Sequence, residues 1–376
     1  MRPLRAACAA AVVVLALVAG YAGGQRGAPA AGTTARTVAA ARSEAAAPPG
    51  SPAPPAPSPS VAPGGIFTTR FVNPSLTFTG GSLYLTRQAS PQAYPPRMTL
   101  SRVDPATGAI MASNTFSPGL VSAPLSAAGW LWVTDDPASV ADLLLLRLDP
   151  RTLMVTGELS VGSHPSGSVG TGGHIAFAGG SIWVDGAGQL VRVSPGTVAA
   201  ELTIPQPGAD SAEVAASPDG GTLIVSEADS GAGAIQRRDP VTGALQASYP
   251  MLGTFAPLIG GVSGAGVWVR EPTGMLGYIE RFQTATVTPQ AGTRVEGSNG
   301  IGASVRDGAL WVSDEAAGPA LNYCADPATG RWLATLPLPD LGQDYLMTVA
   351  DGLIYYSAPG SDGFAIRTVP VPAACG

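Results

Sequence analysis

The chain has 376 residues, including 49 Gly and 36 Pro, and only 12% are charged, against roughly 25% in an average globular protein. All 20 basic residues are Arg, only two residues are His, and the formal net charge is −6. This composition excludes a basic nucleic-acid-binding protein, disfavours an enzyme built on histidine acid–base chemistry and, with one apolar run near spanning length, excludes a multi-pass membrane protein.

The N-terminal segment has the pattern of a secretory signal. Arg2 and Arg5 precede an apolar run over residues 6–22, and small residues follow it. The sequence leaves two outcomes open: cleavage after Ala22, or retention as a single anchor with both Arg in the cytoplasm. Cys8 lies before the apolar core, so it does not predict a lipoprotein. Residues 23–65 are mostly Ala, Pro, Gly, Ser and Thr, which predicts a disordered stalk.

From residue 66 onward, a phrase of small residues followed by an apolar and aromatic strand recurs seven times. Its central residues are Tyr84, Trp132, Trp183, Ile224, Trp268, Trp311 and Tyr355, at spacings of 48, 51, 41, 44, 43 and 44. A second phrase keeps the same period, with Asp at 104, 149, 239 and 326 and Ser at 194. In it, Asp accepts a backbone N–H and Pro and Gly set a tight turn. Two phrases with one period indicate a repeat architecture.

Each repeat predicts four short antiparallel strands, and a lone sheet of that kind cannot bury its faces. Seven sheets arranged radially can, and residues 66–376 provide about 44 residues for each. The predicted fold is therefore all-β: a seven-bladed β-propeller of four-stranded antiparallel blades. The last repeat lacks a fourth strand, so residues 66–72 are expected to complete it and close the ring. The Trp residues of the repeat are expected to pack between blades.

Residues 148–167 and 217–226, the latter followed by residues 239–243, resemble the YVTN-type propeller repeat and the related virginiamycin-B-lyase-like and quinoprotein-like propellers. The resemblance implies seven blades and an extracellular or envelope setting. The lyases use a catalytic His and Glu late in the chain, whereas both His here lie in the first half of the propeller. The calcium-ligand and disulfide signatures usual in quinoprotein enzymes are also missing from this sequence.

Two cysteines remain once Cys8 is assigned to the signal. Outside the cytoplasm, an even pair predicts a disulfide, here between Cys324 and Cys375. The C-terminal tail is expected to reach blade six, and a 51-residue loop corresponds to roughly 4 kcal/mol in the chain-entropy model. Two free, buried thiols are the alternative.

Ligand-binding candidates lie on the face where the second strands end and the connections between blades pass. They are His164, Asn299, Gln343, Asp344, Asp135, Glu227 and Asp314. Carboxylates around the mouth of a central channel could attract a cation or a cationic ligand; the competing interpretation, that Asp caps tight turns and keeps a poorly charged protein soluble, is favoured because no metal-ligand spacing is present. His174 is expected to lie in an apolar strand as a satisfied core residue. No catalytic motif, metal spacing or cofactor signature is present, so none of these is expected.

The sequence favours an extracytoplasmic recognition or scaffold module that binds a partner or ligand at its acidic face. The alternative is a propeller enzyme of the lyase or quinoprotein-like kind with its site at the channel mouth. Expected partners are an extracellular protein, a cell-wall component or a small ligand, with no nucleic acid. The chain is expected to be a monomer, secreted or in the envelope, with membrane contact only through a retained anchor. Its composition is typical of a GC-rich, actinobacterial-type genome.

Overall fold

The structure is a computed structural model, and every residue it describes lies in the compact unit Pro57–Gly376. The described residues are 66–68, 75–89, 96–137, 142–163, 174–186, 188–206, 209–229, 232–251, 257–264, 266–273, 276–298, 302–306, 308–314, 321–336, 347–360 and 363–376. The predicted signal and stalk lie outside them. Within these ranges no helix is long and apolar enough to cross a membrane.

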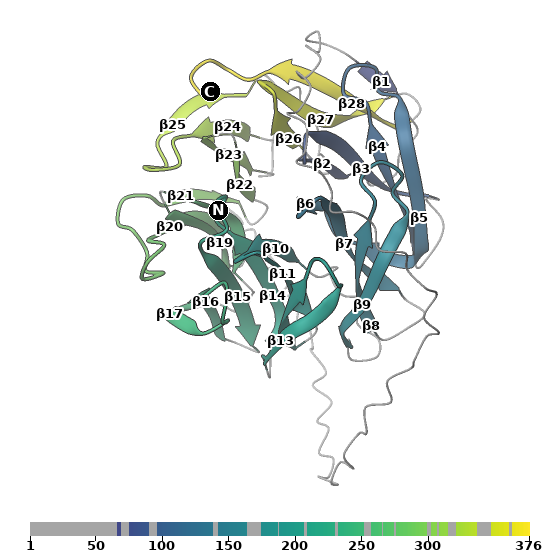
Figure 1. Ribbon diagram of the computed structural model, residues 1–376. Coiled ribbons are helices and arrows are strands. Elements are labelled where there is room, and N and C mark those ends of the chain that lie inside the picture. Colours follow the sequence, from purple (N-terminus) through teal and green to yellow (C-terminus); the bar gives the residue numbers. More distant parts are fainter. Residues whose placement is uncertain are drawn as a thin grey trace, which may run out of the picture. The chain divides into compact units, whose positions relative to one another are not determined.

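The described chain forms seven antiparallel four-stranded units, here called blades 1 to 7 in chain order (Figure 1). Blade 1 contains β2 (Ser75–Thr79), β3 (Ser82–Gln88), β4 (Arg97–Val103) and β5 (Ile110–Val121). Blade 2 contains β6 (Leu125–Ala127), β7 (Trp130–Pro137), β8 (Asp142–Leu148) and β9 (Val155–Ser163). Blade 3 contains β10 (Ile175–Ala178), β11 (Ser181–Gly186), β12 (Gln189–Ser194) and β13 (Ala199–Pro205). Blade 4 contains β14 (Ala209–Ala216), β15 (Leu223–Asp229), β16 (Ala232–Arg238) and β17 (Leu245–Met251).

The last three blades follow the same order, innermost strand first. Blade 5 contains β18 (Leu258–Ser263), β19 (Gly266–Thr273), β20 (Leu276–Phe282) and β21 (Val295–Ser298). Blade 6 contains β22 (Gly302–Arg306), β23 (Ala309–Asp314), β24 (Leu321–Ala325) and β25 (Trp332–Thr335). Blade 7 contains β26 (Met347–Ala350), β27 (Leu353–Gly360) and β28 (Gly363–Pro370), with β1 (Ile66–Thr68) as its outermost strand. The predicted all-β propeller is confirmed.

The hydrophobic core is divided into seven clusters, and each cluster draws its residues from two neighbouring blades. One of them joins Leu83 and Leu85 of blade 1 to Tyr355 and Ile366 of blade 7, so the series of blade contacts closes on itself. The repeated Trp side chains are almost completely buried in these clusters, as predicted: Trp132, Trp183, Trp268 and Trp311. A blade therefore buries its faces only through its neighbours.

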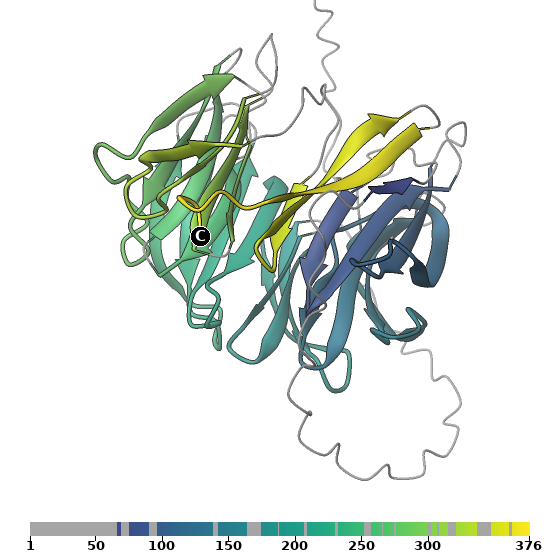
Figure 2. The same ribbon diagram turned by 90° about the horizontal axis from the view of Figure 1, so that it is seen from above.

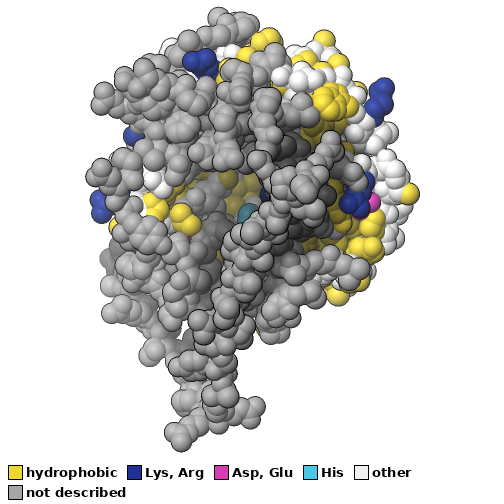
Figure 3. All heavy atoms as spheres, turned by 180° about the vertical axis from the view of Figure 1, so that it is seen from behind, with side chains coloured by type: hydrophobic (Ala, Val, Ile, Leu, Met, Phe, Trp, Pro, Cys, Tyr) yellow, Lys and Arg dark blue, Asp and Glu magenta, His cyan; other side chains and the backbone are white. Residues whose placement is uncertain are grey.

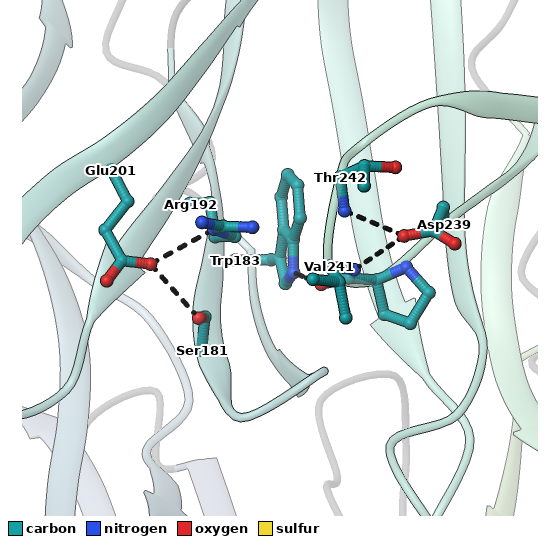
Figure 4. A network of polar contacts seen from close by, with 8 residues as sticks. Ser181, Trp183, Arg192, Glu201, Asp239, Val241 and Thr242 are labelled. Atoms are coloured by element: carbon teal, nitrogen blue, oxygen red, sulfur yellow. Dashed lines mark hydrogen bonds and ion pairs between the residues drawn. The ribbon is translucent and has the colours of Figure 1, made fainter.

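Polar bonds accompany this packing at the turns between third and fourth strands. The indole N–H of Trp183 donates to the carbonyl oxygen of Pro240 in the next blade at 3.1 Å, and Trp268 bonds Pro327 in the same way at 2.9 Å. Within the turn, Asp239 accepts the backbone N–H groups of Thr242 and Val241 at 2.7 and 2.9 Å (Figure 4). These bonds hold the pKa of Asp239 below its ordinary value and confirm the predicted role of Asp in the turn.

Blade 7 is completed by the N-terminal strand, as predicted. Strand β1 pairs antiparallel with β28, with Phe67 opposite Ile366, while the predicted remainder, residues 69–72, lies outside the described residues. Beyond β28 the C-terminal tail runs back to blade 6 (Figure 2). There Cys375 forms the predicted disulfide with Cys324, at a Cα–Cα distance of 6.0 Å.

Removal of residues 66–72 from the full chain is expected to lower the melting temperature and reduce the cooperativity of unfolding, because β28 loses its outer partner. Circular dichroism or calorimetry measures this effect. The control is deletion of residues 40–46 from the predicted stalk, for which no change is expected. Equal, equally cooperative melting of both variants would contradict a stabilising role for β1.

Blades 1 and 2 depart from the prediction of separate sheets. The end of β5 crosses from β4 to β7, so the two blades share one eight-stranded sheet, with Leu120 opposite Asp136. The inner edge of blade 2 is consequently built from the end of β5 and the three-residue strand β6. Gly119 lies at the crossing, where a Cβ atom would come 2.0 Å from the carbonyl oxygen of Asp136. Only glycine permits this backbone approach.

The variant Gly119→Ala is expected to lose about 1–3 kcal/mol of unfolding free energy, since the added methyl group forces the two strands apart. Urea denaturation measures the loss. Gly196→Ala is the matched control, because a Cβ atom there meets no atom within 4 Å. A loss of the same size in both variants would show that the close approach to Asp136 is unimportant.

Candidate functional site

Four of the predicted ligand residues, His164, Asn299, Gln343 and Asp344, lie outside the described residues. The structure places the other three near the ends of second strands: Asp135 on β7, Glu227 on β15 and Asp314 on β23. Each stands three positions beyond the central residue of its repeat, so their backbones lie at corresponding places on one face of the ring. For Asp314 the backbone alone is described.

Glu227 is held by donors within the protein. Its carboxylate accepts bonds from Gln206 Nε2 at 2.6 Å and Gln236 Nε2 at 2.5 Å, and lies 3.6 Å from Arg238. Gln206 follows the outer strand of blade 3, whereas the other two residues belong to blade 4. The contact between Gln206 and Glu227 thus ties these blades together, and a ligand role for Glu227 stays a prediction.

Asp135 is buried, with an exposed fraction of 5%. Its Oδ1 atom has no hydrogen-bond partner among the described residues. Burial, with smaller contributions from the charges of Asp136 and Glu158, raises the pKa of Asp135 to about 7. The carboxyl group of Asp135 therefore holds its proton up to near-neutral pH. Asp135 is for this reason a weaker source of negative charge at the channel mouth than the sequence suggested.

The Asp135→Asn variant is expected to remove a pH dependence of stability. The folded-state pKa of about 7 lies above the ordinary value of 3.8, so the unfolding free energy of the native chain falls as the pH rises between these values. At 1.36 kcal/mol per pKa unit, the difference reaches about 4 kcal/mol at most. Chemical denaturation is expected to show that the stability advantage of the variant over the native chain grows from pH 5 to pH 8. Parallel pH curves for the two chains would contradict the raised pKa.

His174 is not the satisfied core residue that the sequence predicted. It precedes β10 rather than lying within the strand, and its side chain is 40% exposed. His174 Nε2 lies 3.4 Å from Oε1 of Glu213, which belongs to β14 in the next blade and is 16% exposed. Figure 3 shows the opposite face from Figure 1, with a histidine side chain visible in a hollow of that face.

Glu213 connects three blades. Its Oε2 atom accepts the backbone N–H of Ile259, on the innermost strand of blade 5, at 2.5 Å. Burial raises the pKa of Glu213, while His174, this N–H group and the charge of Arg270 on β19 act in the opposite direction. We call His174, Glu213 and Arg270 the axial cluster, because Glu213 stands on an innermost strand and His174 directly precedes one. The sequence did not single out Glu213 or Arg270, since neither stands in a repeated phrase or motif.

The axial cluster can orient an imidazole against a carboxylate, and the charge of Arg270 acts on the same carboxylate. Such a set can bind an anionic group or move a proton at the exposed imidazole. Across the described ranges, no three His, Cys, Asp or Glu side chains come together in a way that could hold a metal ion.

Comparison with known proteins identifies the fold. No family model and no curated protein sequence matches the chain. Among solved structures, BamB from Moraxella catarrhalis is similar with a TM-score of 0.48 and 13% identity, over 78% of this chain and 84% of BamB. The dihydro-heme d1 dehydrogenase NirN, solved in complex with DHE, is similar with a TM-score of 0.51 and 16% identity, over 79% of this chain and 63% of NirN. At this identity, the likeness to NirN establishes the β-propeller fold alone.

Proposed function

We propose that the protein is an extracytoplasmic recognition or scaffold module that binds a partner or small ligand as a monomer. The binding face is the one on which the second strands end. The axial cluster carries this proposal, because it gathers charged side chains from three blades at a place where packing of neighbouring blades does not require them. The predicted candidates His164, Asn299, Gln343 and Asp344 belong to the same proposed face.

The disulfide supports a location outside the cytoplasm. Bonds such as Cys324–Cys375 persist in oxidising compartments and are rare in reducing ones. The predicted signal at residues 1–22 agrees with this location. We also propose that the repeat is of the YVTN type, which the phrases around Asp149 and Asp239 support.

A propeller enzyme with its site at the channel mouth is the second candidate. One observation favours it: His174 is partly exposed and contacts the half-buried carboxylate of Glu213. A histidine held in this way is suited to general acid–base catalysis. An activity lost in both His174→Gln and Glu213→Gln would support this candidate over a pure binding module.

Site-directed photo-cross-linking on intact cells tests the recognition proposal. A photoreactive amino acid replaces either Asp142, at the start of β8, or Met154, which is 64% exposed near the opposite end of the same blade. We expect a saturable cross-linked product from position 142 and none from position 154, with similar melting temperatures. Cross-linking from position 154 alone, or from neither position, would contradict recognition through the proposed face.

A further inference from the structure

The exposed large hydrophobic side chains of the described residues all stand at one end of their blades. Four of them occupy the same place in the repeat, the first paired residue of the outermost strand, opposite the residue that precedes the turn Asp: Ile110, Val155, Leu245 and Trp332. The others, Met111, Met154 and Val241, lie within four residues of these. Blades 3 and 5 hold Ala199 and Pro289 at this place, so it is apolar in six blades.

We call this side of the ring the turn face, because the turns between third and fourth strands lie there. Corresponding places in a ring of similar blades lie at similar heights along the axis, so these side chains stand around one rim. In Figure 1 the outermost strands β5, β17 and β25 lie at the perimeter of the ring. In the described part of the chain, the opposite ends of the outermost strands carry no exposed large hydrophobic side chain. Scattered exposed apolar residues are ordinary in soluble proteins, whereas confinement to one face indicates a contact surface.

The chain that precedes β1 enters blade 7 from the turn face. Strand β28 is the third strand of its blade and therefore ends at the turn face. Strand β1 pairs antiparallel with it, with Ile66 opposite Arg367, so β1 runs away from the turn face. The predicted apolar run and stalk come before Ile66. A retained anchor would therefore draw the turn face, rather than the proposed recognition face, toward a membrane.

Charges of both signs are interspersed in the turns of this face. Carboxylates stand at corresponding places and each accepts backbone N–H groups of its own turn: Asp104, Asp149, Asp239 and Asp326. Arg151 and Arg331 stand in two of the same turns. Contact with a lipid surface would therefore depend on the apolar side chains and not on attraction to an anionic head group.

We propose that the turn face docks on a phospholipid bilayer, with the exposed side chains of the rim inserted into the interfacial region. A bilayer is flat and deformable, so it receives side chains from separate blades at once, whereas a protein partner would have to match each position. Trp332 is stacked on Tyr323 with ring centroids 4.2 Å apart, and aromatic residues of this kind are typical of membrane interfaces. The inference goes beyond the proposed recognition function, because it concerns the opposite face.

Quenching of tryptophan fluorescence tests the insertion. The full chain is reconstituted into phosphatidylcholine vesicles with brominated or unmodified acyl chains, since bromine quenches only a Trp that it contacts. The segment before Ile66 contains no Trp, so its own insertion adds no signal. Trp332 is 47% exposed. We expect brominated lipid to quench an emission component that Trp332→Phe lacks, to the same extent when anionic phosphatidylglycerol is included.

A Trp placed away from the turn face is the matched control. Ser117 is exposed on β5, seven residues beyond Ile110 toward the opposite end of the strand. Trp332→Phe combined with Ser117→Trp is expected to show no more quenching than Trp332→Phe alone. Melting temperatures check that each variant folds.

Charge added to the rim is expected to weaken docking. Val155→Glu with Leu245→Glu removes two half-exposed aliphatic side chains, together equivalent to one whole side chain, which lowers the docking equilibrium constant about tenfold. Ser117→Glu with Thr203→Glu adds the same charge at exposed positions farther along outermost strands and is expected to leave the quenching unchanged.

Several outcomes would overturn the proposal: no quenching in the native chain, quenching that requires anionic lipid, or equal quenching from position 117. A blue shift of Trp332 emission without quenching would assign the turn face to a second copy of the chain and would overturn it as well. Lipid contact at position 154 yields no protein adduct, so the cross-linking test of recognition is decided independently.

Discussion

The contact between each blade and the next is the constraint on which the structure depends. A four-stranded sheet with apolar side chains on both faces has no stable state alone, so every blade relies on two neighbours, and the first and last blades rely on each other. The buried Trp of the second strand packs into this contact, and in blades 3 and 5 its indole N–H also bonds the following blade. The same contact, repeated between successive blades and between the last and the first, closes the blades into a ring.

Repetition separates structural residues from candidate site residues. Arg147 recurs as Arg237 and Arg281, and each donates to backbone carbonyl oxygens in the following blade, which accounts for a recurrent charge without any ligand. His174 and Glu213 occupy corresponding places on the innermost sides of blades 3 and 4, each opposite the residue two positions beyond the central residue of its repeat. Where this place is described in blades 1, 5 and 6, it holds the uncharged residues Ser75, Leu258 and Gly302. Since the ring geometry is satisfied by uncharged residues there, a charged pair confined to two neighbouring blades is the more informative signal of function.

The repeat period was sufficient to predict the blades and the closing strand, because both follow from spacing and from chain order around a ring. The Cys324–Cys375 disulfide was predictable from the even pair of cysteines and from the reach of the C-terminal tail to blade 6. The shared sheet of blades 1 and 2 was not predictable, since Pro118 and Gly119 have the composition of a turn although the strand continues through them. The contact between His174 and Glu213 was not predictable from the sequence either. Both residues lie outside the two repeated phrases, and the Ala-rich strand that contains Glu213 has no periodic pattern that would single it out.

The two ends of the chain are secured by different means, and this difference has a mechanical consequence. The C-terminal tail is covalently fixed to blade 6, whereas the N-terminal side is held by the short pairing of β1 with β28. Any tension that reaches the propeller through the chain preceding Ile66 acts first on β1. The seam between blades 7 and 1 is therefore the point at which force opens the ring, while the disulfide keeps blades 6 and 7 joined after it has opened.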